Sequence, residues 1–341
     1  METSYRPSAV RKTVGSAIQL IQRRAIIFGV LLISIVMGLS SPYFFTINNL
    51  LNITIASSIN GIMACGMAMV IISGGIDLSV GALLAFGGSI SVGLSGAALT
   101  SAARLIVLPW PLAMLGGIVA TAVLGLFSGI IITRFVIPPF IVTLGMMSIA
   151  RGLTYIYGDA VVQKVTGTPM TFFHPVFGFL GGGYIFGIPM PTIVFIFICL
   201  LAWFILSYTS FGRNIYAIGG NEETARLAGI NTFLTKLATY VVIGALSGVA
   251  GIVLTARLSS ASPLTGTGYE LDVISAVVIG GVSLAGGEGS ILGVVAGVLI
   301  IGVLGNGLNL LNVPSFYQYI IKGWILITAV ALDQYYKRKA L

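Results

Sequence analysis

Side chains that could perform acid–base, nucleophilic or metal chemistry are few and scattered in this sequence. Nine acidic residues and one histidine, His174, are spread over 341 positions, and none of them has the spacing of a catalytic triad, a carboxylate pair or a metal site. Cys65 and Cys199 lie inside apolar runs, where packing is the expected role. The phosphate-loop pattern Gly-x-x-x-x-Gly-Lys-Ser/Thr is absent. The sequence therefore predicts no enzyme, no bound cofactor or metal, and no ATP site of the phosphate-loop kind.

The composition is that of a membrane protein. Hydrophobic residues make up 57% of the chain and charged residues only 8%, whereas soluble domains carry about 25% charged residues. The mean hydropathy is +1.06, and apolar runs of about 20 residues, long enough to cross a bilayer as a helix, recur throughout. These figures exclude a water-soluble enzyme and a disordered chain, and they predict an all-α polytopic membrane protein.

Apolar runs separated by Pro, Asn, Gly or charged residues predict about ten transmembrane helices within a domain of residues 25–333. The expected spans are 25–41, 50–72, 78–97, 109–133, 139–157, 189–208, 233–256, 269–284, 290–311 and 316–332. Residues 158–188, rich in Gly, Pro and aromatics, are expected to form a large ordered external loop or a partly re-entrant segment. The run 25–41 lacks a small-residue cleavage site, so it is predicted to be a retained span and not a signal peptide.

The basic residues predict an orientation. If residues 1–24 form a cytoplasmic N-terminus, ten spans return the tail 334–341 to the same side. Most of the 17 Lys and Arg residues then lie inside, and only Arg104, Lys164 and Arg257 lie outside, as the positive-inside rule requires. The net charge of +8 therefore indicates topology and not a nucleic-acid partner.

Two glycine-rich segments resemble each other. Gly74-Gly-Ile-Asp-Leu-Ser-Val-Gly81 and Gly280-Gly-Val-Ser-Leu-Ala-Gly-Gly287 match at four of eight positions. Such paired breaks in two halves of a membrane chain indicate a weak internal repeat around a transport pathway. Asp77 is placed either to cap the helix that follows or to act directly in gating or solute contact.

A third segment, 210–231, predicts a short helix outside the membrane. Asn221 is a suitable N-cap, Glu222 and Glu223 occupy the first turn, and Gly229 ends the helix. A helix of about seven residues is not stable alone in water. It must therefore dock either on its own membrane domain or on a cytoplasmic partner.

Several polar and glycine-containing segments follow one another in a recognisable order. They are 73–81, 139–153, 211–230 and 268–290, followed by Asn306-Gly-Leu-Asn309 and by Gln318 with Lys322-Gly323. In these segments the chain resembles the permease subunit of bacterial ABC sugar importers, in the ribose, xylose and galactose branch. The resemblance covers about residues 48–333.

The resemblance implies a multi-pass protein of the bacterial inner membrane with both termini in the cytoplasm. Its implied partners are a second permease copy, a cytoplasmic ATP-binding subunit that hydrolyses ATP, and an extracytoplasmic solute-binding protein that delivers a sugar. The segment 210–231 would be the cytoplasmic coupling helix that contacts the ATP-binding subunit. The residues expected to serve this contact are Arg213, Asn221, Glu222, Glu223, Ala225, Arg226 and Gly229.

A neutral, hydroxyl-rich solute needs hydrogen-bonding groups without strong charge along its path. The candidates for this substrate pathway are Asn52, Ser57, Asn60, Asp77, Asn306 and Asn309. Hydrogen bonding between helices is an equally good explanation of such residues. Arg151, inside a span, is expected to be paired or to extend to the membrane interface.

Two alternatives remain. A branched-chain amino-acid permease is the nearest relative class, although the segments at 74–81 and 225–230 resemble the sugar branch more closely. An ion-coupled secondary transporter would need carboxylates in mid-membrane, and Asp77 and Asp272 lie at predicted helix ends. The particular sugar, whether a pentose, a hexose or a sugar-derived signal, is not encoded in these patterns.

Overall fold

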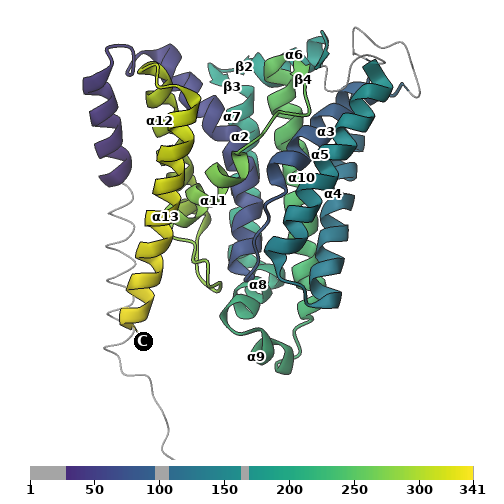
Figure 1. Cartoon of the computed structure of the whole chain (residues 1–341), viewed down its shortest axis with the longest axis vertical. Helices are drawn as coiled ribbons and strands as arrows, with labels where there is room; N and C mark the ends of the chain where they lie inside the picture. The colour runs from purple at the N-terminus through teal and green to yellow at the C-terminus, as the bar shows by residue number, and fades with distance from the viewer. Residues whose placement is uncertain (1–27, 97–106, 163–168, 341) are drawn as a thin grey trace, which may run out of the picture.

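The computed structural model describes residues 28–96, 107–162 and 169–340, which are almost entirely helical. The helices are Phe28–Ser40, α2 (Ile47–Ile72), α3 (Val80–Leu94), α4 (Trp110–Phe135), α5 (Pro139–Val162), α6 (Pro175–Gly182), α7 (Met190–Tyr208), α8 (Ser210–Gly220), α9 (Glu222–Leu227), α10 (Thr232–Leu258), α11 (Tyr269–Ile279), α12 (Ile291–Leu310) and α13 (Ser315–Ala340). The long helices run roughly parallel, with α8 and α9 at one end and α6 with the short strands at the other (Figure 1).

Six helices of the described residues are long and apolar enough to cross a membrane: α2, α4, α5, α7, α10 and α12. The chain is therefore an all-α multi-pass membrane protein. The predicted spans 78–97 and 269–284 contain shorter helices, α3 and α11, of 15 and 11 residues. An 11-residue helix is about 16 Å long, well short of the hydrocarbon core of about 30 Å. The hydropathy pattern overestimated the lengths of these two helices, because it does not distinguish an apolar helix from apolar extended backbone.

The two glycine-rich segments are breaks between helices. Residues 73–79 join α2 to α3, and residues 280–290 join α11 to α12. Gly74 and Gly281 both have φ of +84°, a conformation that favours glycine. The Gly287 N–H donates to the Ile72 carbonyl over 2.9 Å, so the two breaks meet each other.

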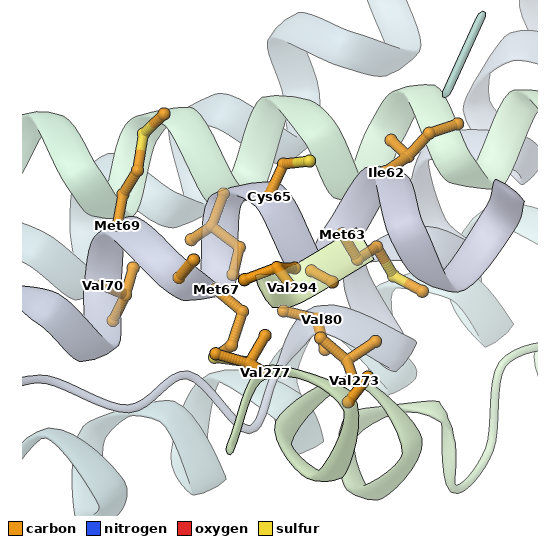
Figure 2. Packing of buried hydrophobic residues seen from close by; sticks show 14 of the residues in the cluster. Ile62, Met63, Cys65, Met67, Met69, Val70, Val80, Val273, Val277 and Val294 are labelled. Atoms are coloured by element: carbon orange, nitrogen blue, oxygen red, sulfur yellow. The ribbon is translucent and has the colours of Figure 1, made fainter. Parts of the chain in front are cut away.

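Helix α2 lies at the centre of the molecule. It packs against α7, α10, α11 and α12, and every residue from 61 to 72 is buried. The apolar side chains of this half interlock with those of its neighbours (Figure 2), which explains why residues 61–72 are apolar on all sides. The Cys65 and Cys199 sulfurs are 3.6 Å apart, so both thiols serve packing between α2 and α7, as predicted.

Small residues let the other helices approach closely. A Cβ atom added at Gly125 of α4 would lie 2.2 Å from the Tyr240 carbonyl oxygen of α10, and one added at Gly251 would lie 2.1 Å from the Leu84 carbonyl oxygen of α3. At Gly293 of α12 it would lie 2.0 Å from the Gly280 carbonyl oxygen. These glycines therefore allow the backbones of neighbouring helices to pack directly against each other.

The segment 158–188 is ordered wherever the structure describes it. Helix α5 continues to Val162, β1 (Met170–Thr171) pairs with β4 (Ser260–Ala261), and β2 (Tyr184–Ile185) pairs with β3 (Ile188–Pro189). Between these strands, α6 packs Phe177 into a cluster with residues of α10. His174 is the N-cap residue of α6 and packs edge-on against Phe177, consistent with a loop residue.

The basic segment 1–24 lies outside the described residues. The predicted tail 334–341 instead continues α13 as far as Ala340, so this helix extends beyond its predicted end at residue 332.

Replacing Gly251 by alanine is expected to lower the free energy of unfolding by about 2 kcal/mol, because the new methyl group would overlap the backbone of α3. Gly145→Ala on α5 is the matched control, since an added Cβ there meets no described atom within 4 Å. Thermal unfolding of the two purified variants in detergent measures the stability of each. Equal midpoints would contradict the close α3–α10 contact.

Candidate functional site

A polar cavity of about 380 Å³ lies among α2, α10, α11, α12 and α13, within the size range of small-molecule sites. It involves the first half of α2 and the last turns of α10 and α12, so it lies toward the end of the bundle opposite α8 and α9. Its lining residues are Asn52, Ala56, Ile59, Asn60, Leu254, Arg257, Leu258, Tyr269, Asp272, Ile301, Gly302, Gly305, Asn306, Asn309, Gln318 and Lys322.

Four of the predicted asparagines, Asn52, Asn60, Asn306 and Asn309, line this cavity. Asn306 also forms a reciprocal amide pair with Asn49, with Nδ2-to-Oδ1 distances of 3.0 and 2.8 Å, so it both faces the cavity and ties α12 to α2. The Asn309 Oδ1 accepts from the Gln318 Nε2 over 2.9 Å. The buried Asn60 Oδ1 has no hydrogen-bond partner in the described part of the chain.

Ser57 and Asp77 are not among the lining residues. Ser57 is buried, and its hydroxyl packs on Gly302 at a contact between α2 and α12. Asp77 lies in the break 73–79, where its Oδ1 accepts from the Ser79 N–H over 2.8 Å and from the Ser79 hydroxyl. Ser79 is the N-cap residue of α3, so Asp77 stabilises the turn that leads into this helix.

A charged pair that sequence reasoning did not assign to the pathway also lines the cavity. The Lys322 Nζ lies 2.7 Å from the Asp272 Oδ2, and Asp272 is only 5% exposed. Its Oδ1 has no partner among the described residues. The residues are 50 positions apart on α11 and α13, too far for spacing to reveal the pair, although an ionisable residue inside a span was the available signal.

Directly beyond the cavity the bundle is closed by apolar side chains. We call Met63, Met67, Val80, Val273, Val277 and Val294 the apolar seal (Figure 2). Each of these residues has 0% exposure. Five of them lie between the cavity-lining residues of α2, α11 and α12 and the two breaks, and Val80 begins α3 after the first break. The cavity therefore does not pass through the bundle.

The breaks in turn contact α8. A Cβ atom at Gly219 would lie 1.7 Å from the Ile72 carbonyl oxygen and 2.4 Å from the Gly287 nitrogen. The Tyr216 hydroxyl donates to the Gly289 carbonyl over 2.9 Å, and burial raises the pKa of the Tyr216 phenol, so it stays a donor at neutral pH. We call Ile72, Gly219, Gly286, Gly287 and Gly289 the glycine junction; through it α8 touches both breaks.

The predicted short helix is present as α9. Asn221 caps it by accepting from the Thr224 N–H over 2.8 Å, and Gly229, with φ of +84°, follows its end. Glu222 forms an ion pair with Lys236 of α10. Ala225 is only 4% exposed and packs inward, whereas Leu227 is 81% exposed.

Helix α8, which precedes α9, was not predicted. The Thr209 hydroxyl caps it by accepting from the Gly212 N–H. Arg213 extends outward and donates to Ser210. The cap at Thr209 was the local signal that could have revealed this helix.

This bundle, with a polar cavity on one side of an apolar seal, has the architecture of a membrane transport protein. Residues 49–330 match the family described as branched-chain amino acid transport system / permease component, and the chain belongs to this family.

Three relatives show where in the family the chain falls. It is 44% identical to the ribose import permease protein RbsC of Escherichia coli strain K12 over 92% of this chain and 94% of that protein. It is 43% identical to RbsC of Bacillus subtilis over 90% of this chain and 91% of that protein. Identity to the D-allose transport system permease protein AlsC of E. coli K12 is 39% over 89% of each chain. No solved structure matches this chain.

Removing one partner of the Lys322–Asp272 pair is expected to destabilise the protein. Lys322→Met leaves the Asp272 carboxylate buried without its cation, at a cost of about 3 kcal/mol in the free energy of unfolding. The double variant Lys322→Met/Asp272→Asn removes both charges and should recover most of the loss. Thermal unfolding of Lys322→Met, of Asp272→Asn and of the double variant measures the coupling energy between the two side chains. If the losses in free energy of unfolding were additive, the two side chains would not interact.

Proposed function

We propose that this chain is the permease subunit of an ATP-driven importer, and that it provides the path of a monosaccharide across the bacterial inner membrane. The observation that carries the proposal is the amide-lined cavity among otherwise apolar helices. Amides donate and accept hydrogen bonds without net charge, which suits sugar hydroxyls. The relatives named for ribose import and D-allose transport support the same substrate class.

Transport would proceed by alternating access. The cavity lies toward the α6 end and the apolar seal toward the other end, so we assign this arrangement to an outward-facing state. In the proposed topology the α6 end is external, α8 and α9 are cytoplasmic, and both termini are cytoplasmic. The ten crossings of this topology include α3 with the break 73–79 and α11 with the break 280–290, each an incomplete helix extended by non-helical backbone.

The segment 210–231, now seen as α8 and α9, would contact the ATP-binding subunit. Exposed Leu227 is an apolar side chain at the end of the bundle, and Glu223 and Arg226 beside it are also exposed. Asn221, Glu222 and Gly229 shape α9, and buried Ala225 seats it on its own chain. Arg213 is exposed on α8 and would extend the same contact.

Movement of α8 would reach the pathway through the glycine junction. Gly219 leaves no room for a side chain between the Ile72 carbonyl and the Gly287 nitrogen, so backbone presses directly on backbone. A displacement of α8 would therefore move the break after α2 and the break before α12 together. Both breaks continue into helices that form the apolar seal, which couples nucleotide binding in the partner to opening of the path.

The remaining partners follow from the same assignment. A second permease copy and two ATP-binding subunits would complete the membrane complex, and a solute-binding protein would deliver the sugar at the α6 end. ATP hydrolysis would belong to the separate subunit, since this sequence has no phosphate loop.

The two alternatives are less well supported. The branched-chain amino-acid name belongs to the family description, while the relatives reported above carry sugar names. Ion-coupled transport needs a carboxylate available to an ion. Asp77 lies away from the cavity, and Asp272 is already paired with Lys322.

Leu227→Arg and Glu223→Arg are expected to weaken co-purification of the ATP-binding subunit about tenfold or more, since exposed contact residues at such an interface carry much of the binding energy. Leu264→Arg, at a residue 67% exposed in the connection before α11, is the control and should bind normally. The proposal fails if the unaltered permease binds no ATP-binding subunit and moves solute on an ion gradient alone.

Asn52→Leu is expected to lower sugar uptake by reconstituted complexes about three- to tenfold, the effect of losing one hydrogen bond to the solute. Binding of the ATP-binding subunit should be unchanged. Ser57→Ala, five residues along the same helix but outside the cavity, should leave uptake unaltered. The cavity would not be the pathway if uptake fell with Ser57→Ala and not with Asn52→Leu.

A further inference from the structure

Two glycines of α12 line the cavity but have different surroundings. At Gly302 an added Cβ atom would lie 2.0 Å from the Ser57 hydroxyl oxygen, so α12 touches α2 at this point. At Gly305, one turn farther along, an added Cβ atom would meet no described atom within 4 Å. The first glycine holds the two helices together, and the second leaves open space.

The open space at Gly305 belongs to the cavity. Ile301, Asn306 and Asn309 line the cavity from the same helix. At 100° per residue, Gly305 falls inside the arc that these residues span. A side chain at Gly305 would therefore project into the cavity and not toward lipid.

The same region offers hydrogen bonds to a solute. Asn306 follows Gly305 directly, and Ala56, also a small residue, lines the cavity from α2. Asn309 and Lys322 also line the cavity, and the Lys322 side chain keeps 20% of its surface exposed while it pairs with Asp272. Space and hydrogen-bonding capacity thus occur together, which is what a polar substituent of a solute requires.

We propose that Gly305 is the size-selecting position of the pathway. The space left by its missing side chain accommodates the hydroxymethyl group that distinguishes a six-carbon from a five-carbon sugar ring, so the permease passes hexoses as well as pentoses. The inference rests on the proposed function of the cavity as a sugar path.

Filling this space should discriminate between sugars by size. One methylene group in a close-fitting pocket changes selectivity by about 10- to 200-fold. Gly305→Leu is therefore expected to lower D-allose uptake at least about tenfold relative to D-ribose uptake. Gly145→Leu, at an exposed glycine of α5 that is equally free of contacts, should leave the ratio unchanged.

A reversible modification tests the same space without relying on how a variant folds. Gly305→Cys and, as control, Gly145→Cys are made in a chain carrying Cys65→Ser and Cys199→Ser. Each is reconstituted with its ATP-binding subunit and treated with thiosulfonates that attach a methylthio or a benzylthio group. Uptake of radiolabelled D-ribose and D-allose, each delivered by its solute-binding protein, is measured before treatment, after it, and after removal of the group with dithiothreitol.

For Gly305→Cys, the methylthio group should reduce D-allose uptake at least about tenfold more than D-ribose uptake, and the benzylthio group should reduce both, with recovery on reduction. Equal losses for the two sugars, or none after complete labelling, would overturn the inference. So would a Gly305→Cys thiol that does not react while the Gly145→Cys thiol does. If the unmodified permease moved neither D-ribose nor D-allose with ATP, that result would instead contradict the proposed function.

Discussion

The structure depends on one constraint: inside a membrane, non-helical backbone must be surrounded by protein, because lipid cannot satisfy its hydrogen bonds. In the proposed topology two such segments, 73–79 and 280–290, interrupt the helices of this chain. They bond to each other through Ile72 and Gly287. The buried residues of the first break are Ser73, Gly75, Asp77 and Ser79. The buried second half of α2 and helix α8, which lies against both breaks, cover this backbone.

From this centre the molecule is organised in layers along its long axis. The polar cavity, the apolar seal, the glycine junction and α8 with α9 follow one another, and α2, α11 and α12 pass through the first three layers. The Asn49–Asn306 amide pair joins α2 to α12 beside the cavity. In the proposed mechanism a displacement of α8 would reach the cavity through the backbone contacts of the glycine junction and the packed side chains of the apolar seal.

Local chemistry was predictable from the sequence, and long-range pairing was not. The two ends of α9 were predicted because Asn221, Glu222 and Gly229 act on the backbone of the same short segment. Four asparagines were assigned to the pathway by their type alone, but type could not exclude Ser57, which the helix turns toward Gly302. The Asp272–Lys322 pair depends on how α11 meets α13, and the inward position of Ala225 depends on how α9 is seated. Neither the Asp272–Lys322 pair nor the inward position of Ala225 can be predicted from residue spacing within one segment.

The apolar seal has an electrical consequence. Six side chains without exposed surface leave no room for a continuous file of water, and an ion without water faces a steep barrier in an apolar constriction. A permease in this arrangement keeps the membrane insulating while it waits for solute. The cell can therefore maintain many copies of such a protein without dissipating the ion gradients on which its other processes run.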